Sequence, residues 1–186
     1  ANAFKETILD TPSGTWASGS SLNTTRWGMG SAARGTNGTN ENALAFGGGT
    51  PGTPMAVTEE WNGSAWSEDS DLNTARKDTT GLGASYTSAL CAGGNTGSRT
   101  AVTETWDGSS WTEVSDLNTA RAGLAGTGTV TSGIIAGGSV PPSTGKTETW
   151  DGSSWTETTD LNTARATGAI AGDSATSALL ADGADS

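Results

Sequence analysis

One short string recurs along the chain and constrains its fold more than any other feature. DLNTAR occurs at 71–76, 116–121 and 160–165, and the related SLNTTR occupies 21–26. Its Arg falls at four positions that are 50, 45 and 44 residues apart: Arg26, Arg76, Arg121 and Arg165. Self-similarity at a period of about 20 to 50 residues is typical of solenoids, propellers and repeat arrays. The chain is therefore built from copies of one structural unit.

Tryptophans stand at fixed distances before each Arg. One lies ten residues upstream in all four copies: Trp16, Trp66, Trp111 and Trp155. A second lies five residues further upstream in three copies: Trp61, Trp106 and Trp150. The segments WNGSAW and WDGSSW between them contain Asn-Gly or Asp-Gly, which favour a type I′ hairpin turn because both of its central positions need φ > 0. Each Trp pair therefore predicts two antiparallel strands joined by a tight turn.

The rest of each copy also has the pattern of short strands. A Gly pair follows each of three Arg residues: Gly48-Gly49, Gly93-Gly94 and Gly137-Gly138. In one copy we expect strands at about 122–128, 132–138, 146–150 and 155–158. Four antiparallel strands in a period near 45 residues describe a propeller blade. We predict an all-β propeller, one domain over 1–186, with four blades whose repeats start near Leu22, Leu72, Leu117 and Leu161.

The two ends of the chain are complementary parts of a blade. KETILDTPSGTW at 5–16 aligns with KTETWDGSSW at 146–155, which holds the third and fourth strands of its copy. The last copy ends after its second strand, near Gly183. We expect residues 5–16 to pair with the strands around 167–181 and complete the last blade, because a closed ring leaves no unpaired strand edge. Pairing between chains, and a piece of a longer propeller, are the alternatives.

Together these residues resemble the kelch repeat of the galactose-oxidase-like propeller class. In that repeat an Arg opens the inner strand, a Gly pair ends the second, an acidic alternating segment forms the third and a Trp begins the fourth. The likeness covers nearly the whole chain, although Trp replaces the usual Tyr in the third strand and such rings commonly have more blades. Blades with LNTAR and WDGSSW strings also resemble repeat proteins predicted for the surfaces of marine viruses and phages. The resemblance implies an extracellular or virion-surface propeller.

The composition excludes several kinds of chemistry. The chain has no His, one Cys and one Tyr, so it cannot build the copper and Tyr–Cys site that the galactose-oxidase resemblance implies. A sialidase-like site needs a Tyr nucleophile with an acidic partner beside an Arg cluster. The repeat Arg residues could supply the cluster, but the single Tyr of the chain, Tyr86, argues against such a site. A net charge of −11 argues against nucleic-acid and anionic-lipid partners, and no apolar run is long enough for membrane insertion. We expect no catalytic, cofactor or metal site.

The repeat Arg and Trp residues each have two interpretations. The Arg set either converges on an anion near the axis or pairs with repeat carboxylates and fixes the packing of the blades. We favour pairing, with these partners: Asp71, Asp116, Asp160 or Glu113. The Trp set either packs between blades, which we favour, or forms a platform for sugar rings.

Two residues break the repeat. Trp27 stands where other copies have Lys77, Ala122 and Ala166, and it is the Trp we select for a possible binding role. Cys91 occupies an apolar strand position, and we expect a buried small side chain there rather than a nucleophile.

Three functions compete at this point. The first is a non-enzymatic structural or binding module for a protein or glycan on a surface, as part of a larger or oligomeric assembly. The second is a glycan-binding lectin that uses loops at the blade edges. The third is a carbohydrate-active enzyme with paired carboxylates. The composition, rich in Gly and poor in charge, with 28 Gly and 16% charged residues, suits the first.

Overall fold

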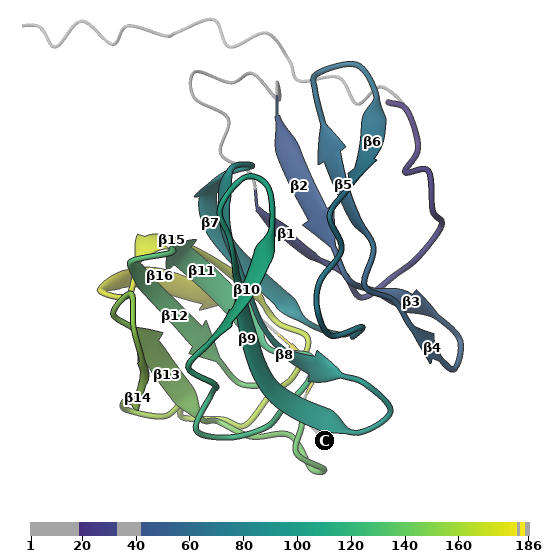
Figure 1. Ribbon diagram of the computed structural model, residues 1–186. Helices are drawn as coiled ribbons and strands as arrows, with labels where there is room; N and C mark the ends of the chain where they lie inside the picture. Colours follow the sequence, from purple (N-terminus) through teal and green to yellow (C-terminus); the bar gives the residue numbers. More distant parts are fainter. Residues whose placement is uncertain (1–18, 33–41, 182, 185–186) are drawn as a thin grey trace, which may run out of the picture.

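The computed structural model describes residues 19–32, 42–181 and 183–184. Within these ranges the chain forms strands, turns and loops but no helix (Figure 1). Three antiparallel sheets have four strands each, and four further strands form two separate pairs. The prediction of an all-β chain with repeated four-stranded sheets is confirmed.

The strands of each sheet follow one another in chain order, and a small hairpin interrupts this order in the first sheet. The first sheet contains β1 (Gly30–Ala32), β2 (Ala43–Phe46), β5 (Thr58–Trp61) and β6 (Trp66–Asp69), and the small hairpin of β3 (Gly49–Thr50) and β4 (Thr53–Pro54) lies between β2 and β5 in the chain. The second contains β7 (Thr80–Ser85), β8 (Ser88–Asn95), β9 (Arg99–Trp106) and β10 (Trp111–Val114). The third contains β11 (Ala125–Thr129), β12 (Ser132–Ala136), β13 (Thr147–Trp150) and β14 (Trp155–Glu157), and the fourth contains β15 (Ala169–Ser174) and β16 (Ser177–Ala181).

The paired tryptophans face each other across the outer hairpins, as Trp106 and Trp111 do in β9 and β10. The turn between them is not the expected type I′ turn. It has four residues, and Gly108 has a positive φ of 97° whereas Asp107 does not. Asp107 instead shapes the turn with its side chain, because its Oδ1 accepts hydrogen bonds from the backbone N–H groups of Ser109 and Ser110. This is the Asx-turn behaviour of a short polar side chain.

The strand boundaries differ from the expected ones where the backbone turns left-handed. The strand expected at 122–128 starts at Ala125, because Gly123 has a φ of 64° and breaks the extended chain. The strand expected at 132–138 ends at Ala136, because both residues of its Gly pair have positive φ. In the first copy the expected Gly48-Gly49 is wrong by one residue. Gly47-Gly48 has the left-handed conformation of the other pairs.

The hydrophobic core lies as layers between successive sheets. Between the first and second sheets, Phe46 packs against Trp111 with ring centroids 4.8 Å apart. Between the second and third, Leu90 and Trp155 belong to a second buried cluster. A sheet therefore contributes one apolar face to each neighbour, which is how propeller blades bury their surface.

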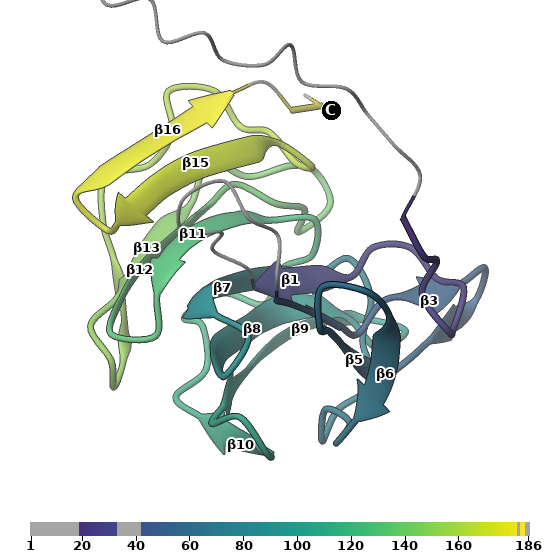
Figure 2. The ribbon, with the colours of Figure 1, turned by 90° about the horizontal axis from the view of Figure 1, so that it is seen from above.

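The first strands of all four copies meet around one axis. Viewed from above in Figure 2, β1, β7, β11 and β15 follow one another in an arc, and together they line a cavity of about 300 Å³. Small residues permit this approach: a Cβ added to Gly81 would lie 2.2 Å from the carbonyl oxygen of Ser31 in the neighbouring strand. The Gly- and Ala-rich first strands thus match a narrow axis.

The ring of sheets is not joined in the described residues. Among the described residues β16 is an edge strand, paired with β15 on one side only, and its Leu179 is 72% exposed. The segment expected to complete this sheet, 5–16, lies outside the described residues, and so does its Trp16.

Candidate functional site

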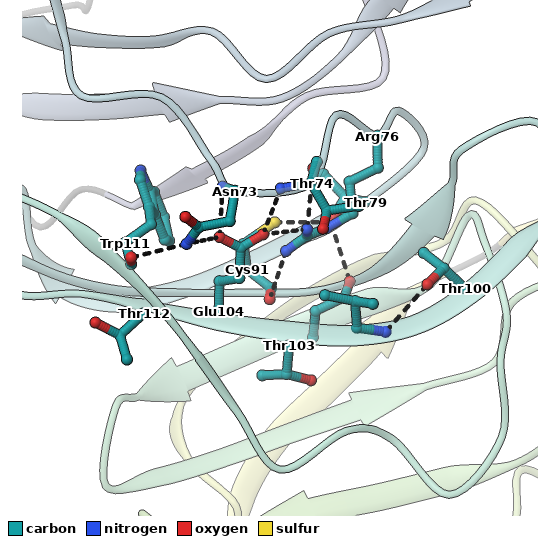
Figure 3. A network of polar contacts seen from close by, with 12 residues as sticks. Asn73, Thr74, Arg76, Thr79, Cys91, Thr100, Thr103, Glu104, Trp111 and Thr112 are labelled. Atoms are coloured by element: carbon teal, nitrogen blue, oxygen red, sulfur yellow. Dashed lines mark hydrogen bonds and ion pairs between the residues drawn. The ribbon is translucent and has the colours of Figure 1, made fainter.

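The repeat Arg residues form the most elaborate polar cluster of the described chain, shown for the second copy in Figure 3. The Nη1 of Arg76 lies 2.5 Å from Oε1 of Glu104, and both side chains are fully buried. The backbone N–H and the side-chain amide of Asn73 donate to Oε2 of the same carboxylate at 2.8 and 2.9 Å. The backbone N–H of Thr74 completes the set. Both carboxylate oxygens are therefore satisfied by donors that precede β7.

The same arrangement recurs in the first and third copies. Arg26 pairs with Glu59, and Arg121 pairs with Glu148 at 2.6 Å. Asn23 and Asn118 take the place of Asn73. Burial by itself raises the pKa of Glu59, but the bonds from Arg26, Asn23 and Thr24 outweigh it and hold that pKa below its ordinary value.

The carboxylates that were expected to pair with Arg have other roles. Asp71, Asp116 and Asp160 each accept a hydrogen bond from a backbone N–H of the preceding sheet, from Thr58, Thr103 and Thr147 respectively. Glu113 is exposed on β10, opposite Glu104. The expected partners were wrong because each Asp lies at the start of the repeat string and reaches the previous sheet, whereas the Glu of the third strand faces the Arg. Glu59, Glu104 and Glu148 recur at a fixed position in the repeat, and this regular spacing could have identified them as the partners of the Arg residues.

The backbones of Arg76 and Arg121 bond to the preceding copy, while their side chains bond within their own sheet. The N–H of Arg76 donates to Met55 O, and its carbonyl accepts from the N–H of Gly48. Arg121 and Arg165 make the equivalent backbone bonds in their copies. An Arg with this geometry joins two sheets. The guanidinium groups of Arg26, Arg76 and Arg121 do not converge on an anion at the axis.

The tryptophans of the second and third sheets pack between sheets. Trp106, Trp111, Trp150 and Trp155 are all buried. The indole N–H of Trp111 donates to Oγ1 of Thr58 in the preceding sheet at 3.0 Å, and that of Trp155 donates to Oγ1 of Thr103 at 3.1 Å. The indoles of Trp111 and Trp155 therefore tie their sheets to the one before, whereas those of Trp106 and Trp150 donate to the carbonyls of Tyr86 and Val130 in their own sheets.

The tryptophans of the first sheet are more exposed. Trp61 and Trp66 are only half-buried, and they line an open cavity of about 450 Å³ together with Gly19, Ser20 and Ala43. In the second and third sheets the same face is covered by the preceding sheet. Among the described residues, nothing covers this packing face of the first sheet as the preceding sheet covers it in the other two.

Trp27 lies at one end of the axis and is 47% exposed. The ammonium of Lys77 stands over its ring, 4.7 Å from the centroid, which is a cation–π arrangement. Lys77 is the residue that replaces Trp27 in the next copy, so the two irregular positions of the repeat contact each other. The structure therefore places Trp27 on the surface and not in an interface between sheets.

Cys91 is fully buried in β8, as the sequence predicted. Burial raises the pKa of its thiol, and its Sγ lies 3.0 Å from the hydroxyl of Thr79. A raised pKa keeps the sulfur in its weakly reactive thiol form.

Comparison with known proteins adds no relative: no family model matches the chain, and no curated protein matches it. In the described part of the chain, no group of three or more His, Cys, Asp and Glu residues is placed to hold a metal ion. That part also contains no helix long and apolar enough to cross a membrane.

Proposed function

We propose that the chain is a non-enzymatic propeller of four kelch-like blades, which acts as a structural and binding module on an extracellular or virion surface. The observation that carries the proposal is the use of the repeated charges. In three copies the Arg and the third-strand Glu are buried against each other, and in the second and third copies the Arg backbone also bonds to the preceding copy. The repeated Arg and Glu residues therefore have a structural role inside the sheets. Contact with partners would then be made by the loops at the ends of the blades.

The ring closes, in this proposal, through residues 5–16 as the third and fourth strands of the last blade. Two uncovered surfaces support it. The edge strand β16 exposes Leu179, and the outer part of the first sheet exposes Trp61 and Trp66. In the second and third sheets, tryptophans at these positions pack against the preceding sheet. The outer strands that β15 and β16 lack would cover both surfaces at once.

A glycan-binding lectin is the second candidate, and Trp27 favours it. Exposed indole rings stack on the apolar faces of sugars, and Trp27 is an exposed Trp outside the packing pattern. A carbohydrate-active enzyme that uses paired carboxylates is the third candidate.

A glycan array and a glycoside hydrolase screen on the same purified chain separate these functions. Binding of a glycan, or retention of a surface protein from the native assembly, without turnover is the expected result. Hydrolysis of a glycan that is abolished by one carboxylate-to-amide substitution would refute the non-enzymatic proposal. Two catalytic carboxylates would then have to lie roughly 5 to 9 Å apart.

A further inference from the structure

One end of the axis combines a cavity, polar groups and two cations that form no ion pair with any described residue. Arg26, Arg76, Arg121 and Lys146 all have a carboxylate partner. Arg99 and Lys77 differ from them: Arg99 donates to the hydroxyl of Ser139 at 3.1 Å, and Lys77 lies over Trp27. Neither forms an ion pair among the described residues, so both bring positive charge to this end of a chain whose net charge is −11, although Asp78 lines the same cavity as Arg99.

The cavity has a volume of about 220 Å³ and lies where the second, third and fourth copies meet. Arg99, Asn95, Asp78 and Ser139 supply its polar groups. Ala122 and Ala166 form part of its wall, and they occupy the repeat position that Trp27 and Lys77 fill in the first two copies. The space therefore exists because two copies carry Ala at a position where the others carry large side chains.

The polar groups of this cavity are held in place by the fold. Asn95 pairs through its backbone with Lys77, and it is opposite Arg99 in the β8–β9 hairpin. Its Oδ1 accepts a hydrogen bond from the N–H of Gly97 at 2.8 Å, so its amide N–H₂ is the group left for a ligand. Asp78 has a φ of 53°, and its carbonyl accepts from Gly123 N–H at 2.8 Å, which fixes the residue at the axis.

We propose that this end of the axis binds a carboxylated sugar, such as a uronic or sialic acid residue at the end of a glycan. The guanidinium of Arg99 would hold the carboxylate, since its planar fork matches that group. Ring hydroxyls would bind to three further side chains: Asp78 would accept a hydrogen bond, the amide of Asn95 would donate one, and the hydroxyl of Ser139 could do either. Trp27 lies close by, because its neighbour Gly28 is packed against Asp78, and it offers an apolar face to an adjoining sugar ring. This inference rests on the proposed binding function and names its ligand class.

The test is a titration of the full chain with glucuronate and N-acetylneuraminate, with glucose as the neutral counterpart. Arg99→Gln removes the fork, and Ala122→Leu fills the cavity with a larger side chain that adds no charge. Lys146→Gln is the matched control, since Lys146 is a half-exposed basic residue paired with Glu157. Unchanged melting temperatures of all three variants show that the fold is retained.

We expect an acidic sugar to bind more tightly than glucose. Arg99→Gln should weaken that binding about tenfold or more, the loss that follows removal of a charged hydrogen bond. Ala122→Leu should abolish it, and Lys146→Gln should leave it unchanged. Equal binding of acidic and neutral sugars, or wild-type affinity in Arg99→Gln, would overturn the inference while leaving the binding function standing. Hydrolysis of the sugars would overturn the proposed function instead.

Discussion

Replacing Trp111 with Ala tests whether the repeat tryptophans hold the sheets together. Trp111 is 5% exposed, and it packs edge-on against Phe46 of the preceding sheet at 4.8 Å. Truncation of a buried Trp costs about 3–5 kcal/mol. The indole N–H bond to Thr58 is also lost, which leaves a buried hydroxyl without its donor at a cost of about 1–3 kcal/mol that overlaps the first figure. We therefore expect the free energy of unfolding to fall by about 4 kcal/mol.

Equilibrium unfolding in urea, followed by circular dichroism so that the loss of an indole does not distort the signal, measures this difference. Trp111→Phe helps to separate the two contributions, because it keeps an aromatic ring against Phe46 while it removes the N–H donor and part of the buried indole. Trp27→Ala is the matched control. Its ring is 47% exposed, and its cation–π contact with Lys77 is worth only about 0.5–1 kcal/mol.

The result that would refute this reasoning is a Trp111→Ala variant that unfolds within about 1 kcal/mol of the wild type. Such a variant, if it also lost binding to a glycan or protein, would make the repeat tryptophans a binding platform. A loss in Trp27→Ala as large as that in Trp111→Ala would equally contradict the distinction between buried and exposed tryptophans.

Three further perturbations test the charges, the closure and the axis. Glu59 has a pKa below its ordinary value of 4.5, so its stabilising effect is complete above that value and is lost as the pH falls through the lowered one; the difference in unfolding free energy between wild type and Glu59→Gln should shrink as the pH is lowered below about 4.5, and a constant difference would contradict it. The repeat alignment puts Ile8 opposite Ala178, so Cys at both positions should form a disulfide within one chain on oxidation; non-reducing electrophoresis checks this, with a disulfide-linked dimer indicating strand exchange between chains and an absence of any bond opposing closure. Gly93→Ala should lower the melting temperature, since φ is 61° and a Cβ would lie 2.8 Å from a carbonyl oxygen; Gly19→Ala, with open space around it, is the control, and equal melting temperatures would refute the steric reason.

Local features of the fold followed from the sequence because they depend on residues close together in the chain. The Trp pairs and their Gly-containing turns predicted hairpins, and β9 pairs with β10 as expected. The turn type was wrong, since the side chain of Asp107, and not a second left-handed residue, shapes the loop. The Gly pair of the first copy was misplaced by one residue because three consecutive glycines occur there, and only the backbone conformation shows which two are left-handed.

The sequence by itself determined the repeated unit, the all-β class and the burial of Cys91, because periodicity and apolar patterning act within each copy. Only the tertiary structure decided which carboxylate pairs with Arg76. Glu104 and Asp71 both recur at fixed positions in the repeat, but Glu104 lies beside Arg76 in the second sheet whereas Asp71 bonds to Thr58 in the first. The tertiary structure also decided that Trp27 is exposed and that Ala122 lines a cavity. These properties depend on how one sheet packs on the next. Side chains some 50 residues apart meet at these contacts, as Trp111 and Thr58 do, and the pattern within a single copy does not specify them.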